Sequence, residues 1–188
     1  MKQIRIAWCL AGLVLLGLAG CTPQYDWRVV SVGDGQVRAM FPDKPRTSER
    51  EFVFEGHAIT FSLTSASVND VLFTVGYASL PGALQQEPSA RERLVRQIQT
   101  SLYQNLGVQP PIQMPAAASQ FVVEGVAAQK SGPLRLEAVV WATEQALIEG
   151  IVLGVSDTLP QDQINEFLRE LAPDQRPSLE QEASAEAF

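Results

Sequence analysis

Residues 58–65 read AITFSLTS, and this stretch decides the fold class of the chain. Apolar side chains alternate in it with small or polar ones, and the apolar ones are Ile59, Phe61 and Leu63. A period of two is typical of an antiparallel strand that buries one face and leaves the other in water. The preceding Gly56-His57 pair is a hairpin signal, so residues 51–55 are expected to form the partner strand. The sequence therefore predicts an antiparallel sheet built around this hairpin.

Three further strands are expected next to this hairpin along the chain. Residues 27–32 and 37–41 flank the turn signal Gly33-Asp34-Gly35 and are predicted to form an earlier hairpin. On the other side, Val68-Asn69-Asp70 turns the chain into a strand over residues 71–78. The first part of the domain is thus expected to be a nearly continuous meander of five strands.

The strongest helix signal in the sequence follows this meander. Ser89 and Glu92 form the Ser-x-x-Glu pattern of a capping box, which predicts that the helix begins there. Apolar residues then recur at four-residue spacing: Leu94, Ile98, Leu102 and Leu106. This stripe is expected to pack on the sheet, and Gly107 is expected to end the helix.

The pattern returns to strands and closes with a second helix. The expected strands are 120–127, 134–143 and 146–156. The helix is expected over residues 158–171, with Thr158 and Gln161 as its capping box. Its buried face is expected to consist of Ile164, Phe167, Leu168 and Leu171.

Five strands, a helix, three strands and a helix predict an α+β fold. The expected architecture is one antiparallel sheet of about seven or eight strands covered by two helices. Residues 26–172 are expected to form a single domain. Residues 173–188 are rich in Asp, Gln, Glu, Ser and Ala, and we expect an acidic flexible tail there.

Composition and charge narrow the function classes. The chain has 188 residues, of which 46% are hydrophobic and 19% are charged, as in an ordinary folded domain. Its formal net charge is -7, which excludes a strongly basic nucleic-acid binder.

The first twenty residues have the pattern of an export signal. Lys2 and Arg5 precede an uncharged stretch from Ile6 to Gly20, which is too short to favour a transmembrane helix. Leu18-Ala19-Gly20-Cys21 resembles the lipobox of bacterial lipoproteins. That resemblance implies removal of residues 1–20 as a signal peptide, a diacylglyceryl group on the Cys21 sulfur and an acyl chain on the new amino terminus. The alternative is an ordinary signal peptide followed by an incidental cysteine.

The lipobox resemblance also predicts how the protein is placed in the cell. Residues 21–25 become a lipidated tether, and Thr22 after the cysteine implies sorting to the outer membrane, facing the periplasm. Removal of Lys2 and Arg5 leaves 12 basic residues against 21 acidic ones, a net charge of -9. Such a surface is repelled by anionic head groups and by nucleic acid. The protein is therefore expected to be attached to the membrane through the lipid on Cys21, and not through a basic surface.

The order of elements resembles that of a known group of proteins. Strands at the start, Phe41-Pro42 at a strand end, a helix after the meander and later hairpins are similar to PsbP-like proteins, and DcrB-type periplasmic lipoproteins are the nearer comparison. The resemblance extends from Trp27 to Leu171. It implies a non-catalytic accessory or assembly factor, and it assigns no site residue.

The sequence contains no recognisable catalytic, cofactor or metal motif. His57 is the only histidine, and we expect it in an exposed hairpin turn. The alternative is a divalent-metal site made by His57 with Glu51 and Glu55, although no fourth ligand is visible. There is no Gly-x-Ser-x-Gly elbow and no glycine-rich phosphate loop. We therefore expect neither an enzyme nor a cofactor.

Two loops and two aromatic residues are the candidate partner contacts. Residues 81–87 enter the first helix, and residues 110–118 leave it. Proline-rich extended segments lose little entropy on docking, which favours Pro110 and Pro111 as contacts. Trp27 and Trp141 become candidates if they are exposed.

These observations leave three functions open. The first is a non-catalytic accessory lipoprotein that binds another envelope protein, for which an exposed apolar surface is expected. The second is a carrier or sensor of a small apolar or lipid ligand held between sheet and helix, for which a lined cavity is expected. The third is a carboxylate-based envelope hydrolase, which needs two acidic residues in one cleft.

Overall fold

The computed structural model describes residues 24–33, 35–126 and 132–171. The expected signal peptide, Cys21 and the expected acidic tail lie outside these residues. Within the described residues the fold is α+β, as expected, with eight strands in two antiparallel sheets. No helix of this part of the chain has the length and apolar content needed to cross a bilayer.

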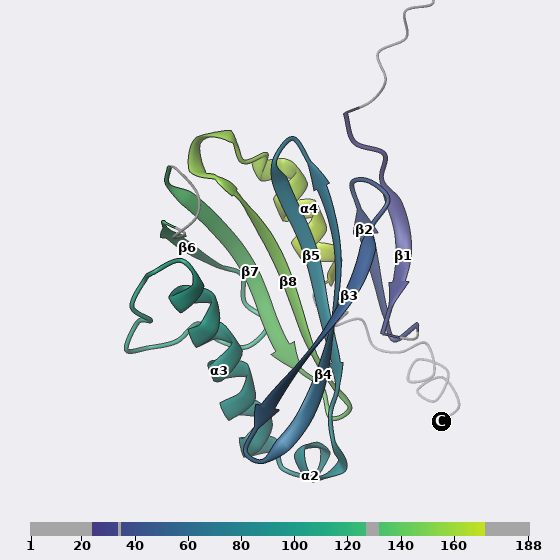
Figure 1. Ribbon diagram of the computed structural model, residues 1–188, viewed down its shortest axis with the longest axis vertical. Helices are drawn as coiled ribbons and strands as arrows, with labels where there is room; N and C mark the ends of the chain where they lie inside the picture. The colour runs from purple at the N-terminus through teal and green to yellow at the C-terminus, as the bar shows by residue number, and fades with distance from the viewer. Residues whose placement is uncertain (1–23, 34, 127–131, 172–188) are drawn as a thin grey trace, which may run out of the picture.

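The main sheet has the strand order β3-β4-β5-β8-β7-β6 (Figure 1). In the described residues its strands are β3 (Arg46–Phe54), β4 (His57–Val68), β5 (Val71–Ser79), β6 (Phe121–Gly125), β7 (Leu134–Ala142) and β8 (Ala146–Val155). β5 pairs with β8, so the early meander and the later strands become one sheet. This long-range pairing places β8 in the middle of the sheet, between β5 and β7.

The expectation of one continuous sheet is wrong. β1 (Arg28–Val32) and β2 (Val37–Phe41) pair only with each other in the described structure and form a separate two-stranded sheet. Pro42 and Pro45 follow β2 and cannot continue a ladder into β3. Ala39 and Phe41 are instead buried in a cluster with residues of α4 (Gln161–Leu171).

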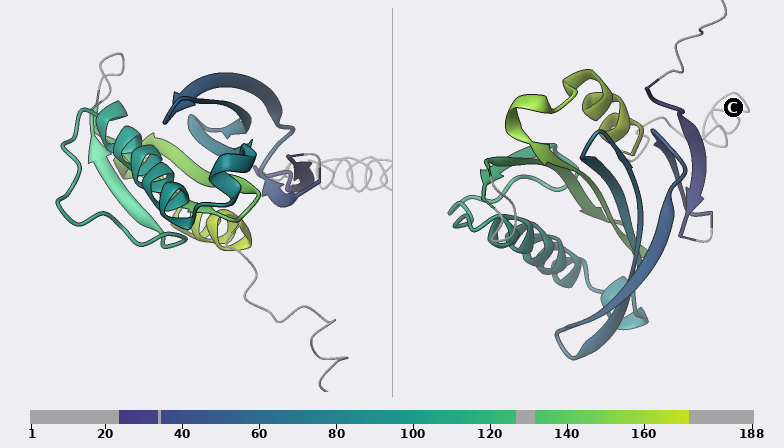
Figure 2. Two further views of the ribbon diagram at one scale, coloured as in Figure 1. Left: turned by 90° about the horizontal axis from the view of Figure 1, so that it is seen from below. Right: turned by 45° about the horizontal axis from the view of Figure 1, so that its top comes forward.

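The two long helices cover opposite faces of the main sheet (Figures 1 and 2). α3 (Pro88–Asn105) packs on one face, where its Leu94 and Leu102 join a buried cluster that we call the α3-side cluster. α4 and the β1–β2 hairpin cover the other face, where their buried residues form a second cluster that we call the α4-side cluster. The expected α4 stripe is confirmed, since its four members, Ile164, Phe167, Leu168 and Leu171, are all buried.

Neither expected capping box forms. α3 begins at Pro88, with Glu87 in place of Ser89 as its N-cap, two positions earlier than the capping box predicts. Glu87 makes no side-chain cap bond, and Ser89 Oγ donates to Glu87 Oε1 instead. Proline is well suited to the first helical turn because its missing N–H has no partner there anyway. Before α4, Thr158 ends a short 3-10 turn, η1 (Ser156–Thr158), and donates to the Val155 carbonyl.

Two further boundaries differ from the expectation. β3 begins at Arg46 and not at residue 51. The sequence pattern missed these first residues because the edge strand is exposed on both faces there and shows no apolar alternation. The segment expected as a loop over residues 81–87 contains a short helix, α2 (Gly82–Gln85), whose Leu84 is buried. Gly107 follows the helix with a φ of 68°, the left-handed conformation that favours glycine at a helix end.

Candidate binding groove beside helix α3

The carboxylates of the described residues form no cluster that could hold a metal ion. No group of three or more His, Cys, Asp or Glu side chains in this part of the chain can hold a metal ion, so Glu51, Glu55 and His57 are not brought together. Four surface hollows in the described structure each contain a single carboxylate: Glu92, Glu144, Asp70 and Glu49. A glycosidase-type mechanism uses a pair of carboxylates, one on each side of the bond to be cleaved, and none of these four hollows holds such a pair.

One of these hollows is a groove between α3 and residues 112–117, which we call the α3 groove. Its volume is about 680 Å³. Helix α3 provides one wall through residues spaced three or four apart, Pro88, Arg91, Glu92, Val95, Arg96 and Gln99. Residues at this spacing lie on one face of a helix, so the groove runs along the helix axis.

The opposite wall is a loop held against the domain at both ends. At its start, Val108 N donates to the Tyr103 carbonyl at 3.0 Å. At its end, Ala118 N donates to the Val140 carbonyl of β7 at 2.9 Å. Pro110, Pro111 and Pro115 restrict the backbone between these two points. The loop is therefore tied to the domain at both ends and restricted in conformation between them.

Gln99 joins the two walls of the groove. Its side chain is completely buried, and its Nε2 donates to the Pro115 carbonyl at 3.1 Å. Its Oε1 is buried without a hydrogen-bond partner among the described residues. A buried acceptor without a donor costs about 1–3 kcal/mol and calls for an explanation.

The loop wall presents an exposed apolar residue at the groove. Ile112 is fully exposed, whereas Val95 on the facing helix is buried. Met114 is half-buried and packs against the α3-side cluster. An exposed large apolar side chain beside an apolar floor is typical of a surface that another molecule covers.

Two arginines give the helix wall a basic character. Arg91 Nη1 donates to the Leu84 carbonyl at 3.2 Å and to that of Gln85, both neutral groups. The Arg96 side chain makes no ion pair with the carboxylates of the described residues. Glu92 is the one acidic side chain among the residues that line this groove. The groove therefore carries a net positive charge on a chain whose formal net charge is -7.

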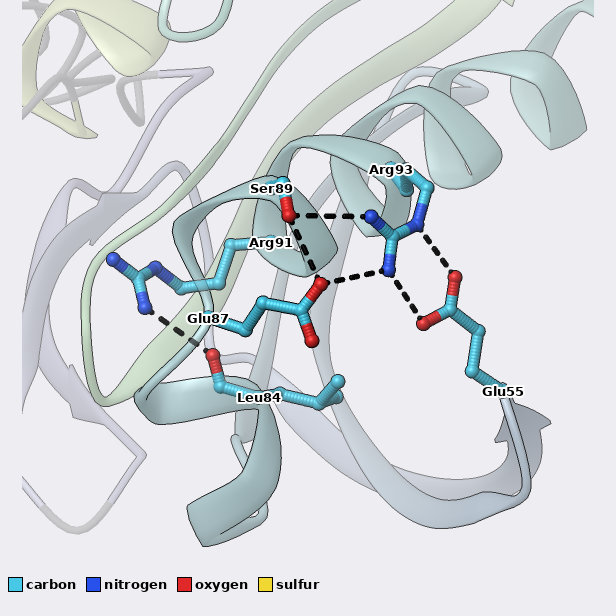
Figure 3. Close-up of polar contacts among 6 residues, drawn as sticks. All are labelled: Glu55, Leu84, Glu87, Ser89, Arg91 and Arg93. Atoms are coloured by element: carbon cyan, nitrogen blue, oxygen red, sulfur yellow. Dashed lines mark hydrogen bonds and ion pairs between the residues drawn. The ribbon is translucent and has the colours of Figure 1, made fainter.

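A third arginine fixes the start of α3 and so positions the helix wall (Figure 3). Arg93 Nε and Nη2 lie 2.7 and 2.9 Å from the two carboxylate oxygens of Glu55, in the turn between β3 and β4. Nη2 also lies 3.2 Å from Glu87 Oε1. The hydrogen bonds from Arg93 lower the pKa of Glu55, and Ser89 and then Arg93 lower that of Glu87. The pKa of Arg93 is raised by the same contacts.

The candidate partner contacts expected from sequence have different surroundings. Pro110 is half-buried and Pro111 exposed, and both lie in the loop of the α3 groove, next to Ile112. Trp27 is half-buried, stacked on Tyr25 with ring centroids 5.9 Å apart. Trp141 is 6% exposed and belongs to the α4-side cluster, so it offers no surface to a partner. Cys21 lies outside the described residues.

Sequence reasoning did not identify Gln99, Arg96 or Ile112 individually. The available signal for Ile112 was its position, an isolated large apolar residue in a proline-rich loop. Gln99 carried no signal, because its role depends on the loop that folds back over it. Comparison with known proteins gives no further guidance: no protein-family model, no curated protein and no solved structure matches the chain.

Proposed function

We propose that this protein is a membrane-anchored envelope lipoprotein whose domain is a non-catalytic binding module. The observation that carries the proposal is the α3 groove, a surface with an exposed Ile112 and an apolar floor. Such a surface favours a complex by removing apolar area from water, a contribution of about 25 cal/mol per Å² from which the entropic cost of association is subtracted.

The anchor in this proposal is the lipid on Cys21, after removal of residues 1–20. The proposed location is the periplasmic face of the outer membrane, and the proposed partner is another envelope protein. Each buried methylene of an acyl chain contributes about 0.8 kcal/mol to membrane binding, so several chains hold the protein durably. The anchor then confines the groove to a thin layer next to the membrane, which raises its effective concentration toward partners in that layer.

The family that we propose is that of PsbP-like proteins, with DcrB-type periplasmic lipoproteins as the nearer comparison. Support comes from the succession of strands and helices along the chain and from Phe41-Pro42 at the end of β2. This family assignment favours an accessory role over catalysis. It adds no residue to the groove, because fold alone does not determine function.

A carrier of a small apolar or lipid ligand is the second candidate function. It is favoured by the volume of the α3 groove, about 680 Å³, which lies in the usual range of small-molecule sites. The proline-rich wall and the exposed Ile112 at its side favour the protein partner instead. The two functions differ in what is recovered with the purified protein, an apolar small molecule or another polypeptide.

The proposed function is tested by crosslinking in intact cells, with the native chain compared with Cys21→Ala. With an alkyne-labelled palmitate in the medium, we expect the native chain to carry the label and the variant to carry none. The native chain should yield one dominant crosslinked envelope protein, identified by mass spectrometry, and the variant should lose it.

Circular dichroism of the purified variant serves as the control that the domain still folds. Labelling of Cys21→Ala at the native level would contradict lipidation of Cys21. A labelled native chain that crosslinks to no protein above background would contradict the accessory role and leave the ligand carrier as the better account.

A further inference from the structure

We infer that the α3 groove binds an extended segment of an envelope protein that places an acidic side chain close to a large apolar one. This inference rests on the proposed function and specifies the chemistry of the partner. Three features of the groove carry it, namely its charge, its exposed apolar residue and the buried acceptor of Gln99.

The charge of the groove selects for an acidic group. Arg91 and Arg96 flank the floor on the α3 wall, opposed by Glu92 alone. Arg91 donates to neutral carbonyls, and Arg96 has no carboxylate partner in the described structure, whereas Arg93 on the same helix is already held by Glu55 and Glu87. A guanidinium binds a carboxylate through two parallel hydrogen bonds. Arg96 is therefore the residue best placed to receive an acidic side chain.

The apolar side chain of the partner is expected against Ile112. Ile112 is fully exposed, and Met114 and Ala142 continue the apolar lining behind it. The same groove thus offers an apolar and a basic contact. A segment with one apolar and one acidic residue close together satisfies both.

Gln99 favours an extended segment over a helical one. Its Nε2 is held by the Pro115 carbonyl, so its Oε1 is the acceptor that remains without a donor in the described structure. An extended backbone has free N–H groups along its length, whereas those of a helix interior are already bonded within the helix. Because Gln99 Oε1 is closed to solvent in this structure, an incoming strand-like segment supplies the donor that Gln99 lacks by moving the loop aside as it binds.

The test is selection from a random-peptide display library on the full-length lipoprotein held in detergent micelles. Enriched peptides are synthesised, and their Kd is measured by fluorescence anisotropy. We expect them to carry Asp or Glu within a few residues of Leu, Ile, Met or Phe. Arg96→Gln should weaken binding about tenfold or more, as expected for loss of a charge-assisted hydrogen bond. Ile112→Ser should weaken it by a similar factor.

Arg169→Gln is the matched control, because Arg169 is an exposed arginine on α4, on the other face of the sheet. It should leave the Kd unchanged. If the peptides lose binding with Ile112→Ser but lack acidic residues and ignore Arg96→Gln, the inference on partner chemistry is wrong while the groove remains a binding site. If no peptide is enriched, or if Ile112→Ser binds all of them normally, the groove is not a binding site and the proposed function loses its support.

The acidic segment after α4 is the competing occupant. Residues 173–188 contain four acidic residues, Asp174, Glu180, Glu182 and Glu186. A chain ending at Ala172 should bind the selected peptides with unchanged Kd if the occupant belongs to a partner. Tighter binding by the shortened chain, together with binding of a synthetic 173–188 peptide that Arg96→Gln abolishes, would assign the groove to the chain's own tail and overturn the inference.

Discussion

Phe167→Ala is expected to lower the free energy of unfolding by about 3–5 kcal/mol, the usual loss for a large aromatic side chain removed from a core. Phe167 is completely buried between α4 and the main sheet. Its ring meets Phe41 of β2 and Phe73 of β5 edge to face, with centroids 5.7 and 5.4 Å away. It therefore connects three elements that do not hydrogen-bond to one another, and its loss leaves a cavity where they meet.

The measurement is urea-induced unfolding of the purified protein, followed by circular dichroism. Since small domains are stable by about 5–15 kcal/mol, the expected loss moves the midpoint strongly. Glu170→Ala is the matched control, because this residue is exposed on the same helix and should change stability by less than about 0.5 kcal/mol. A loss below about 1 kcal/mol for Phe167→Ala would show that α4 does not hold the β1–β2 hairpin on the sheet as described.

Glu149→Gln is expected to remove a pH dependence of the free energy of unfolding. In the native chain this dependence comes from Glu149, in the middle of the main sheet. Glu149 lies on β8, opposite Gly76 of β5, and is 4% exposed. A Cβ on Gly76 would lie 2.5 Å from Glu149 Cγ, so only glycine leaves room for this side chain. Burial raises the pKa of Glu149 from its ordinary value of 4.5 to about 8. The carboxyl is therefore mostly protonated at neutral pH.

The sign of the effect follows from proton linkage. Because the folded state holds a proton that the unfolded state releases above about pH 4.5, the stability contributed by Glu149 is complete below that pH. It falls by at most about 1.4 kcal/mol per pH unit as the pH rises toward 8. A glutamine has no such proton. The difference in free energy of unfolding between the variant and the native chain should therefore shift in favour of the variant by on the order of 3 kcal/mol from about pH 5.5 to about pH 8.5.

Urea midpoints at these two pH values measure this difference, and Glu170→Gln on the exposed face of α4 is the control for removal of a surface carboxylate. The same pH dependence in the native chain and in Glu149→Gln would contradict the raised pKa. Glu137, in the same sheet, differs from Glu149 in its hydrogen bonding. It is also buried, at 1% exposed, but it accepts hydrogen bonds from Arg135, Gln120 and Gln161.

Local sequence pattern predicted the elements of the domain well where burial is one-sided. The alternation in residues 58–65 correctly indicated β4, because Ile59 and Phe61 point into the α3-side core while Ala58 and Thr60 face water. The α4 stripe was equally clear. Where both faces of a strand meet solvent, as in the first residues of β3, the same reasoning has no signal to use.

Capping motifs and sheet membership were less predictable. Ser89 and Thr158 match a capping box in sequence, yet a proline one position earlier and a 3-10 turn determine the helix starts. The β1–β2 hairpin is a local feature, and its turn was visible in the sequence. Its separation from the main sheet depends on how Phe41 packs with α4, a contact between residues distant in the chain.

The candidate site was predictable only as a region. A proline-rich loop after the first helix suggested a partner surface over residues 110–118, and the α3 groove is formed by that loop. Its chemistry comes from residues of α3 that the loop meets when it folds back. The bond from Gln99 to Pro115 spans sixteen positions, and no short motif encodes such a contact.

The most direct test of the central claim, that the α3 groove is the partner surface, is site-specific photocrosslinking in intact cells. A benzophenone amino acid replaces Ile112 in one strain and Val53 or Val29 in two others. The two valines are also exposed, by 67% and 55%, but lie on β3 and β1. We predict one protein adduct from position 112 and none from positions 53 and 29. No adduct at position 112, or the same adduct from all three positions, would contradict the account.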